Sequence, residues 1–140
     1  TIAGYQMKKA DIEVIKDLAP GLPRILADKD QLQQVFLNMI INAKDAMEEE
    51  GGKLTIATAR VSEWVEVKLA DTGCGIPGDK LDKIFKPLFT TKPESKGTGL
   101  GLSISLAIVE RHQGRIDVAS EVGKGTAFTI KLPISDENKS

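Results

Sequence analysis

The sequence is short of several kinds of residue, and each shortage excludes a class of protein. Its 140 residues contain one cysteine, Cys74, so no internal disulfide can form and a reducing compartment is expected. No apolar run approaches the roughly 18 residues that a membrane-spanning helix needs. The net charge of −1 gives no overall attraction to nucleic acid or to an anionic membrane. Any binding site for an anion must therefore be local.

Hydrophobic patterning predicts one domain of the α/β (α+β) class. The expected helices run from the N-cap Asp28 to about Glu50 and from about Leu100 to His112, with a short helix near 79–85. The expected strands cover 11–18, 53–60, 65–71, 115–121 and 125–133, the first of them as an edge strand. This order predicts a two-layer α/β sandwich, in which helices cover one face of a mixed, mostly antiparallel sheet.

The first long helix carries a narrow polar stripe on an otherwise apolar surface. Its members are Gln31, Gln34, Asn38, Asn42 and Asp45, three or four residues apart and so on one side of the helix. Asparagine is a poor residue inside a helix, and carboxamide oxygens can ligate a hard cation such as Mg²⁺. The pattern therefore indicates either the lining of a cavity or simply the solvated edge of an amphipathic helix.

A second feature is "DTGCGIP" at 71–77, which directly follows a predicted strand. A strand that ends in an acid and opens into Gly-x-Gly lets the backbone approach a ligand closely. Asp71 can accept a hydrogen bond from an exocyclic amine such as that of adenine. The alternative is a tight strand-to-loop turn without a ligand.

The third feature is "KGTGLGLSIS", where Gly97, Gly99 and Gly101 stand at the start of the second helix. Helix N-termini favour anions, and glycines expose their amide N–H groups without a side chain in the way. Lys92 and Lys96 could add countercharge. The alternative is the flexible tip of a lid. A Walker-type phosphate loop is excluded, because no Gly-Lys-Ser/Thr follows.

In the order "NMIINAKDA", "DTGCGIP", "IFKPLFTTK" and "GTGLGLSIS", these motifs resemble the ATP-binding catalytic domain of sensor histidine kinases, in the superfamily of DNA gyrase B, Hsp90 and MutL. The resemblance implies ATP and Mg²⁺ as cofactors. It covers 11–133, which we take as the ATP-binding catalytic domain, with a lid at about 78–99. Residues 1–10 are expected to be a flank or linker, and 134–140 a C-terminal tail.

The resemblance also implies roles for single residues. Asn42 should ligate Mg²⁺ and Asn38 should lie beside the triphosphate, both as catalytic residues, while Asp71 holds the adenine amino group with help from Thr126. The other implied nucleotide-binding positions are Asp45, Gly73, Gly75, Ile76, Lys92, Gly97, Thr98, Gly99, Leu100, Gly101 and Leu102. Phe85 and Phe89 match an aromatic box that anchors the lid. Many relatives carry a basic residue where this chain has Asp45, and Lys92 is the candidate to replace that charge.

The one histidine decides the expected mechanism. His112 stands at a helix C-terminus, where we interpret it as structural. The family's phosphate acceptor lies on a separate dimerisation hairpin, so we expect the chain, which does not begin with Met, to be the catalytic fragment of a longer cytoplasmic or membrane-bound kinase. Its expected partners are that hairpin and a response regulator, with no nucleic acid, and the fragment alone is expected to be a monomer.

Three other classes stay open. ATP-hydrolysing clamps of the superfamily carry a glutamate where this chain has Asn38, and an amide cannot take a proton, so only very slow unaided hydrolysis is expected. A nucleotide-binding scaffold without catalysis and a serine-directed kinase are the remaining alternatives.

Overall fold

The computed structural model of this protein describes residues 12–23, 25–48, 50–85 and 101–134. The strands within these residues are β1 (Ile12–Asp17), β2 (Gly52–Val61), β3 (Trp64–Asp71), β4 (Arg115–Glu121) and β5 (Gly125–Pro133). The helices are α2 (Lys29–Ala46), the short 3₁₀ helix η1 (Gly78–Lys80) and α3 (Gly101–Arg111). No helix in the described part of the chain is both long and apolar enough to cross a membrane.

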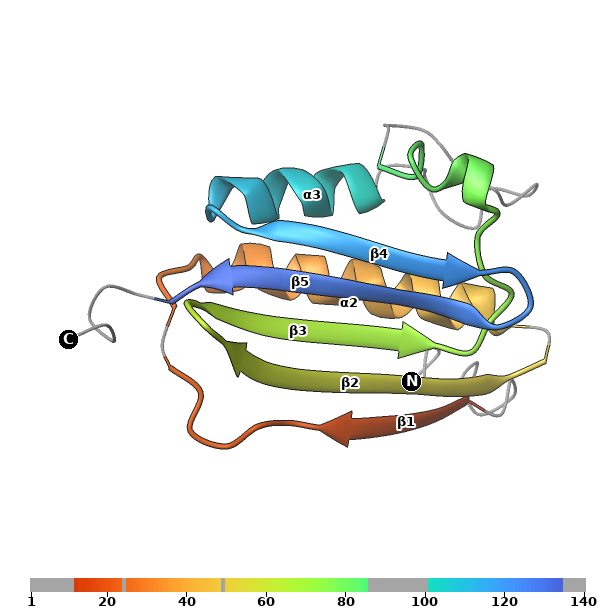
Figure 1. Ribbon diagram of the computed structural model, residues 1–140, viewed down its shortest axis with the longest axis horizontal. Helices are drawn as coiled ribbons and strands as arrows, with labels where there is room; N and C mark the ends of the chain where they lie inside the picture. The colour runs from red at the N-terminus through yellow and green to blue at the C-terminus, as the bar shows by residue number, and fades with distance from the viewer. Residues whose placement is uncertain (1–11, 24, 49, 86–100, 135–140) are drawn as a thin grey trace.

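The strands form one mixed sheet in the order β1-β2-β3-β5-β4 (Figure 1). β1 runs parallel to β2, and the other neighbouring pairs are antiparallel. The chain reaches β2 from β1 through α2, because parallel neighbours need a crossover of this kind. The predicted edge position of the first strand is confirmed, as are the two antiparallel hairpins and the two-layer architecture.

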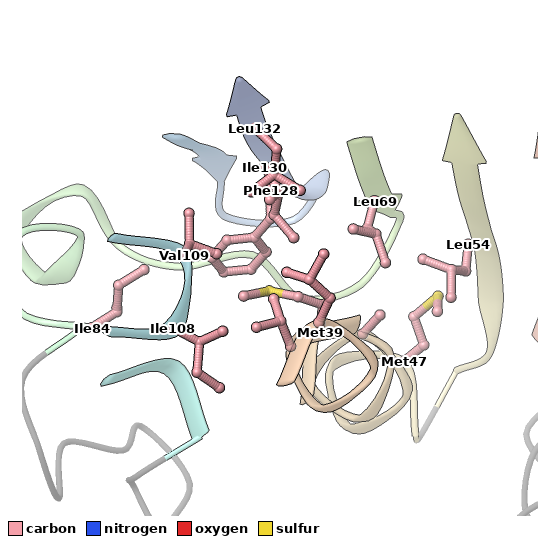
Figure 2. Close-up of a cluster of buried hydrophobic side chains, with 13 residues drawn as sticks. Met39, Met47, Leu54, Leu69, Ile84, Ile108, Val109, Phe128, Ile130 and Leu132 are labelled. Atoms are coloured by element: carbon pink, nitrogen blue, oxygen red, sulfur yellow. The ribbon is translucent and has the colours of Figure 1, made fainter. Parts of the chain in front are cut away.

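The two helices cover one face of the sheet, and the core lies between the layers. Figure 2 shows side chains from α2, α3 and the strands β2, β3 and β5 gathered into one cluster. Its buried members are Leu32, Val35, Met39, Ala43, Met47, Leu54, Leu69, Ile84, Ile108, Val109, Phe128, Ile130 and Leu132. Complete burial of one large side chain of this kind stabilises a fold by about 1.5–3 kcal/mol, so this cluster holds the helices on the sheet.

α2 begins where the sequence predicts and ends earlier. The Asp28 carboxylate accepts the backbone N–H of Gln31 at 3.1 Å, which confirms the predicted N-cap. The expected end near Glu50 is wrong, because the helix stops at Ala46. The Ala46 carbonyl accepts the N–H of Cys74 at 3.2 Å, so the loop after β3 takes a partner that a longer helix would have used. Tertiary structure thus sets this helix end.

The segment after β3 also differs from expectation. The short helix expected near 79–85 is limited to η1, and turns follow it as far as Phe85. Ile84 is buried in the core, and the Phe85 ring meets the Phe128 ring edge-on, with 6.4 Å between centroids. Packing of these two side chains onto the core ends the helix early. The start of the expected lid is therefore attached to the sheet.

Candidate functional site

The ends of β3 and β4 and the starts of β5 and α3 lie at one end of the sheet, and the candidate site lies there. β3 ends at Asp71, β4 ends at Glu121 and β5 begins at Gly125. Figure 1 shows that α3, which begins at Gly101, starts at this same end. Residues that are far apart in the sequence are thereby collected in one region.

Asp71 lies at the centre of this region. It pairs with Thr126 across β3 and β5, and its Oδ1 accepts the N–H of Gly73 at 2.8 Å and that of Thr126 at 3.3 Å. Burial raises the pKa of the Asp71 carboxyl above its ordinary value of 3.8, and these two hydrogen bonds offset part of the rise. Both bonds fall on Oδ1, so Oδ2 has no partner among the residues that the structure describes. The buried carboxyl therefore keeps one acceptor for a ligand.

The loop after Asp71 is fixed by its own glycines. A Cβ on Gly73 would clash with the Ala46 carbonyl, and one on Gly75, whose φ is +79°, would clash with the Glu121 carbonyl. The Cys74 carbonyl accepts the N–H of Gly123 at 2.9 Å, which ties the loop to the β4–β5 turn. The close backbone approach that the motif predicted is therefore present, and it is made to the protein's own backbone. The role of these glycines in an adenine pocket stays a prediction.

A hydroxyl pair lies beside Asp71. Ser120 on β4 pairs with Thr126 on β5, and their hydroxyl oxygens are 2.7 Å apart. Ser120 also accepts the N–H of Ile76 at 2.7 Å and donates to the Gly125 carbonyl at 3.0 Å. Thr126 and Ile76 were predicted from the sequence, whereas Ser120 was not. Ser120 could have been predicted from the hairpin, because the short turn between β4 and β5 places it opposite Thr126.

The asparagine stripe is not simply a solvated edge. Gln34 is exposed, but Asn38 is half-buried and its Nδ2 donates to the Gly101 carbonyl at 3.2 Å and to Ser105 Oγ at 3.1 Å. Ser105 is fully buried and donates to the same carbonyl at 2.8 Å. Asn38 thus connects the middle of α2 to the first turn of α3. Ser105 is a second residue that the sequence motifs did not indicate.

Asn42 and Asp45 follow Asn38 along α2, and both are half-buried. Asn42 comes one turn later and therefore projects from the same side of the helix. The described residues contain no group of three or more His, Cys, Asp or Glu that could hold a metal by themselves. A cation at Asn42 would need most of its ligands from phosphate oxygens and water. This suits Mg²⁺, which is usually held by few protein ligands at phosphate sites.

Part of the predicted phosphate loop lies outside the described residues. These positions are Lys92, Lys96, Gly97, Thr98, Gly99 and Leu100, and Phe89 of the predicted aromatic box lies outside the described residues as well. Gly101 and Leu102 are described: both are half-buried in the first turn of α3, and Leu102 packs against the core. The structure therefore fixes the place where the loop reaches the helix.

His112 lies away from this region, and both its ring nitrogens are engaged. Nδ1 is 2.8 Å from the Ile108 carbonyl, and Nε2 accepts the backbone N–H of Asp28 at 2.9 Å. A carbonyl can only accept and an N–H can only donate, so the ring is the neutral tautomer with its hydrogen on Nδ1. This geometry agrees with the structural role expected of the residue.

The amino-acid sequence is similar to a known family and to several curated proteins. A family model described as "Histidine kinase-, DNA gyrase B-, and HSP90-like ATPase" matches residues 27–136. The sensor kinase CckA of Brucella abortus (strain 2308) is 43% identical over 144 residues, which cover 92% of this chain and 15% of CckA. The sensor histidine kinase ZraS of Escherichia coli (strain K12) is 46% identical over 118 residues, which cover 84% of this chain and 25% of ZraS. The chain spans a quarter or less of the length of these two curated relatives.

Solved structures match along nearly the whole chain. The nucleotide-free catalytic domain of histidine kinase ThkA has a TM-score of 0.82 and 33% identity, covering 97% of this chain and 88% of that one. The complex of ThkA with the response regulator protein TrrA matches with a TM-score of 0.77 and 30% identity, covering 98% of this chain and 38% of that one.

Proposed function

This chain belongs to the histidine kinase-, DNA gyrase B- and HSP90-like ATPase family, and from that premise we propose that it is the Mg-ATP-binding catalytic domain of a two-component sensor histidine kinase. The family and the fold class expected from the sequence are both confirmed. In this proposal the γ-phosphate of ATP passes to a histidine on a dimerisation hairpin outside this chain, and from there to a response regulator. The reaction takes place in the cytoplasm, where ATP is supplied.

The arrangement of Asp71 carries the proposal. Its Oδ1 is held by the N–H groups of Gly73 and Thr126, which leaves Oδ2 to accept a ligand's hydrogen. A buried carboxylate of this kind suits the exocyclic amino group of adenine, because a charged acceptor strengthens the hydrogen bond. Thr126 lies directly across the sheet from Asp71 and can assist, either directly or through a water.

We assign the triphosphate to the region where α2 contacts the start of α3. The N–H groups at a helix N-terminus favour phosphate, and Asn38 holds the first turn of α3 in place through Gly101. Asn42 would supply a carboxamide oxygen to Mg²⁺, and the cation would neutralise phosphate charge. Lys92, together with Gly97, Thr98, Gly99 and Leu100, completes the phosphate site in this proposal, and the half-buried Asp45 borders it.

The chemistry asked of these residues is positioning and charge neutralisation. Phosphoryl transfer needs little covalent participation by the protein. The nitrogens of His112 are both engaged, which supports an acceptor elsewhere. A dimerisation hairpin and a response regulator are therefore the proposed partners, with the isolated chain as a monomer.

A second function, rapid ATP hydrolysis, is disfavoured by Asn38. A hydrolase needs a group that takes a proton from water, and a carboxamide cannot do so. The Asn38 Nδ2 group, moreover, already donates to Gly101 and Ser105. We therefore expect this chain alone to hydrolyse ATP very slowly.

Transfer of labelled phosphate from Mg-ATP to the parent protein's dimerisation hairpin, added in trans, tests the proposal. An acid-labile, alkali-stable label on the hairpin is the expected result. Fast hydrolysis without the hairpin would indicate a clamp-type ATPase, and an acid-stable label a serine-directed kinase. ATP binding without any transfer would favour a scaffold that has lost catalysis. Each of these three results contradicts the proposal.

A further inference from the structure

The hydrogen bonds of Ser120 determine where the Thr126 hydroxyl, beside the proposed adenine site, places its hydrogen. Asp71, Thr126 and Ser120 lie in one row across β3, β5 and β4, on the face that the helices cover. We infer that Ser120 is a specificity-determining residue that fixes the Thr126 hydroxyl as a hydrogen-bond acceptor and so makes the site select a 6-amino purine. This inference rests on the proposed binding of adenine at Asp71.

The direction of the hydrogen bond between the Ser120 and Thr126 hydroxyls follows from the other contacts of Ser120. Ser120 has one hydroxyl hydrogen, which it donates to the Gly125 carbonyl at 3.0 Å, and its oxygen accepts the N–H of Ile76 at 2.7 Å. The 2.7 Å contact between Ser120 Oγ and Thr126 Oγ1 could run either way in isolation. The Gly125 carbonyl can only accept, so we assign the hydrogen of Ser120 to that carbonyl and the hydrogen of Thr126 to the Ser120 oxygen. Ser120 then donates one hydrogen bond and accepts two, which is its full capacity.

The consequence for Thr126 is that its oxygen has only lone pairs left for a ligand. Asp71 offers the same chemistry through Oδ2, since its Oδ1 is bound by two N–H groups. A water that donated to both side chains would in turn have only lone pairs left for the base. Directly or through such a water, this end of the site attracts the amino group of adenine and repels the 6-oxo group of guanine or hypoxanthine.

Removal of the Ser120 hydroxyl reverses this polarity. In Ser120→Ala the hydrogen of Thr126 has no acceptor on β4 and becomes free to turn toward a ligand. A 6-oxo group can then accept it. Inosine triphosphate has a 6-oxo group and an N1–H where ATP has a 6-amino group and an unprotonated N1. We expect the preference for ATP over inosine triphosphate to fall by about tenfold or more, mainly because inosine triphosphate binds more tightly.

The experiment measures dissociation constants of the whole chain for ATP and inosine triphosphate by titration calorimetry. Ser120→Thr keeps a hydroxyl and should keep the preference. Ser105→Ala is the matched control, because it removes the same group near the phosphates and should weaken both nucleotides equally. In the double variant Ser120→Ala/Thr126→Val the gain for inosine triphosphate should disappear, since no hydroxyl remains.

Two results would overturn the inference, and they are distinguishable. Equal weakening of both nucleotides by Ser120→Ala, with unchanged preference, means that Ser120 only supports the loop at Ile76. A wild-type chain that binds neither nucleotide removes the proposed function itself, and this inference with it. Unfolding midpoints of each variant identify losses that come from misfolding. If Ser120→Ala does not fold, Thr126→Val decides the outcome: loss of the acceptor hydroxyl should lower the preference for ATP, and an unchanged preference overturns the inference.

Discussion

The Nε2 atom of His112 accepts the backbone N–H of Asp28 at 2.9 Å, across 84 positions of sequence. Asp28 is the N-cap of α2, and His112 follows the last residue of α3. The bond therefore joins the start of one helix to the end of the other. The two helices are held together by this bond and by the bond from Asn38 to Gly101 at the start of α3.

Replacement of His112 should lower stability without removing a phosphate acceptor. His112→Phe keeps a ring of similar size but loses both nitrogens. We expect the free energy of unfolding to fall by about 1–3 kcal/mol, because two hydrogen bonds are lost and each has a net value of about 0.5–1.5 kcal/mol. Urea titration measures this change. Incubation of the wild-type chain alone with labelled ATP should give no label on His112, and a labelled His112 would contradict the structural role.

Asp71→Asn should weaken ATP binding strongly. The amide is nearly the same size, but it replaces a charged acceptor by a neutral one. Hydrogen bonds to charged groups are worth about 1.5–3 kcal/mol, so the dissociation constant should rise roughly 10- to 100-fold. Asp17→Asn, an exposed change of equal charge on β1, is the control. Unchanged affinity in Asp71→Asn would exclude Asp71 from the base site.

The raised pKa of Asp71 predicts two opposite pH dependences. The folded chain holds this proton more tightly than the unfolded chain, so the stability that Asp71 contributes falls as pH rises from 3.8 through the folded pKa. ATP binding needs the ionised form and should strengthen over the same window. Unfolding free energies and ATP affinities of wild type and Asp71→Asn, measured from about pH 4 to 7, test both. The variant should lack both dependences.

Asn42→Ala should impair the use of Mg²⁺ more than the binding of ATP itself. Loss of one ligand leaves the cation held by phosphate and water alone. We expect phosphate transfer to the hairpin to fall by about 10- to 100-fold or more, while affinity for ATP without Mg²⁺ changes little. Ile41→Ala, at the exposed neighbouring position, is the control. Undiminished transfer would rule out Asn42 as a ligand.

Asn38→Asp should weaken the contact between α2 and α3 and lower the stability of the fold. The new carboxylate would face the Gly101 carbonyl, where Nδ2 now donates at 3.2 Å. An acceptor facing an acceptor costs about 1–3 kcal/mol, which thermal or urea unfolding would detect. Gln34→Glu adds the same charge one turn earlier at an exposed position and should be close to neutral. Equal stability of the two variants would contradict the role given to Asn38.

Local patterns were enough to predict most of the fold. Alternating residues such as Val65, Val67 and Leu69 mark one face of β3, and turn glycines mark the hairpins. The sequence predicted a mixed sheet but did not say which strands pair in parallel, and the structure shows that they are β1 and β2. The end of α2 was missed because the partner of the Ala46 carbonyl is Cys74.

Candidate site residues could be named from the sequence where a motif contains them. Asp71, Asn38 and Thr126 were predicted in this way. The structure places Thr126 beside Asp71 and Asn38 beside Gly101, and their roles in binding a nucleotide stay predictions. Ser105 and Ser120 were missed because serine occurs in so many settings that its type carries little information. Their importance comes from what they touch, and hydrogen-bond partners on other elements cannot be read from composition or spacing.

The bond between Asp71 and Thr126 spans 55 positions of sequence. The proposed base site therefore depends on contacts between residues far apart in the sequence, and it cannot form before the last hairpin has docked on the rest of the sheet. A ligand at this proposed site would bind only to the folded domain. Its stabilisation, about 2.7 kcal/mol at a concentration one hundred times its dissociation constant, acts against unfolding of the whole chain. A truncation that removes β4 and β5 would thus lose this protection even though both asparagines of α2 remain.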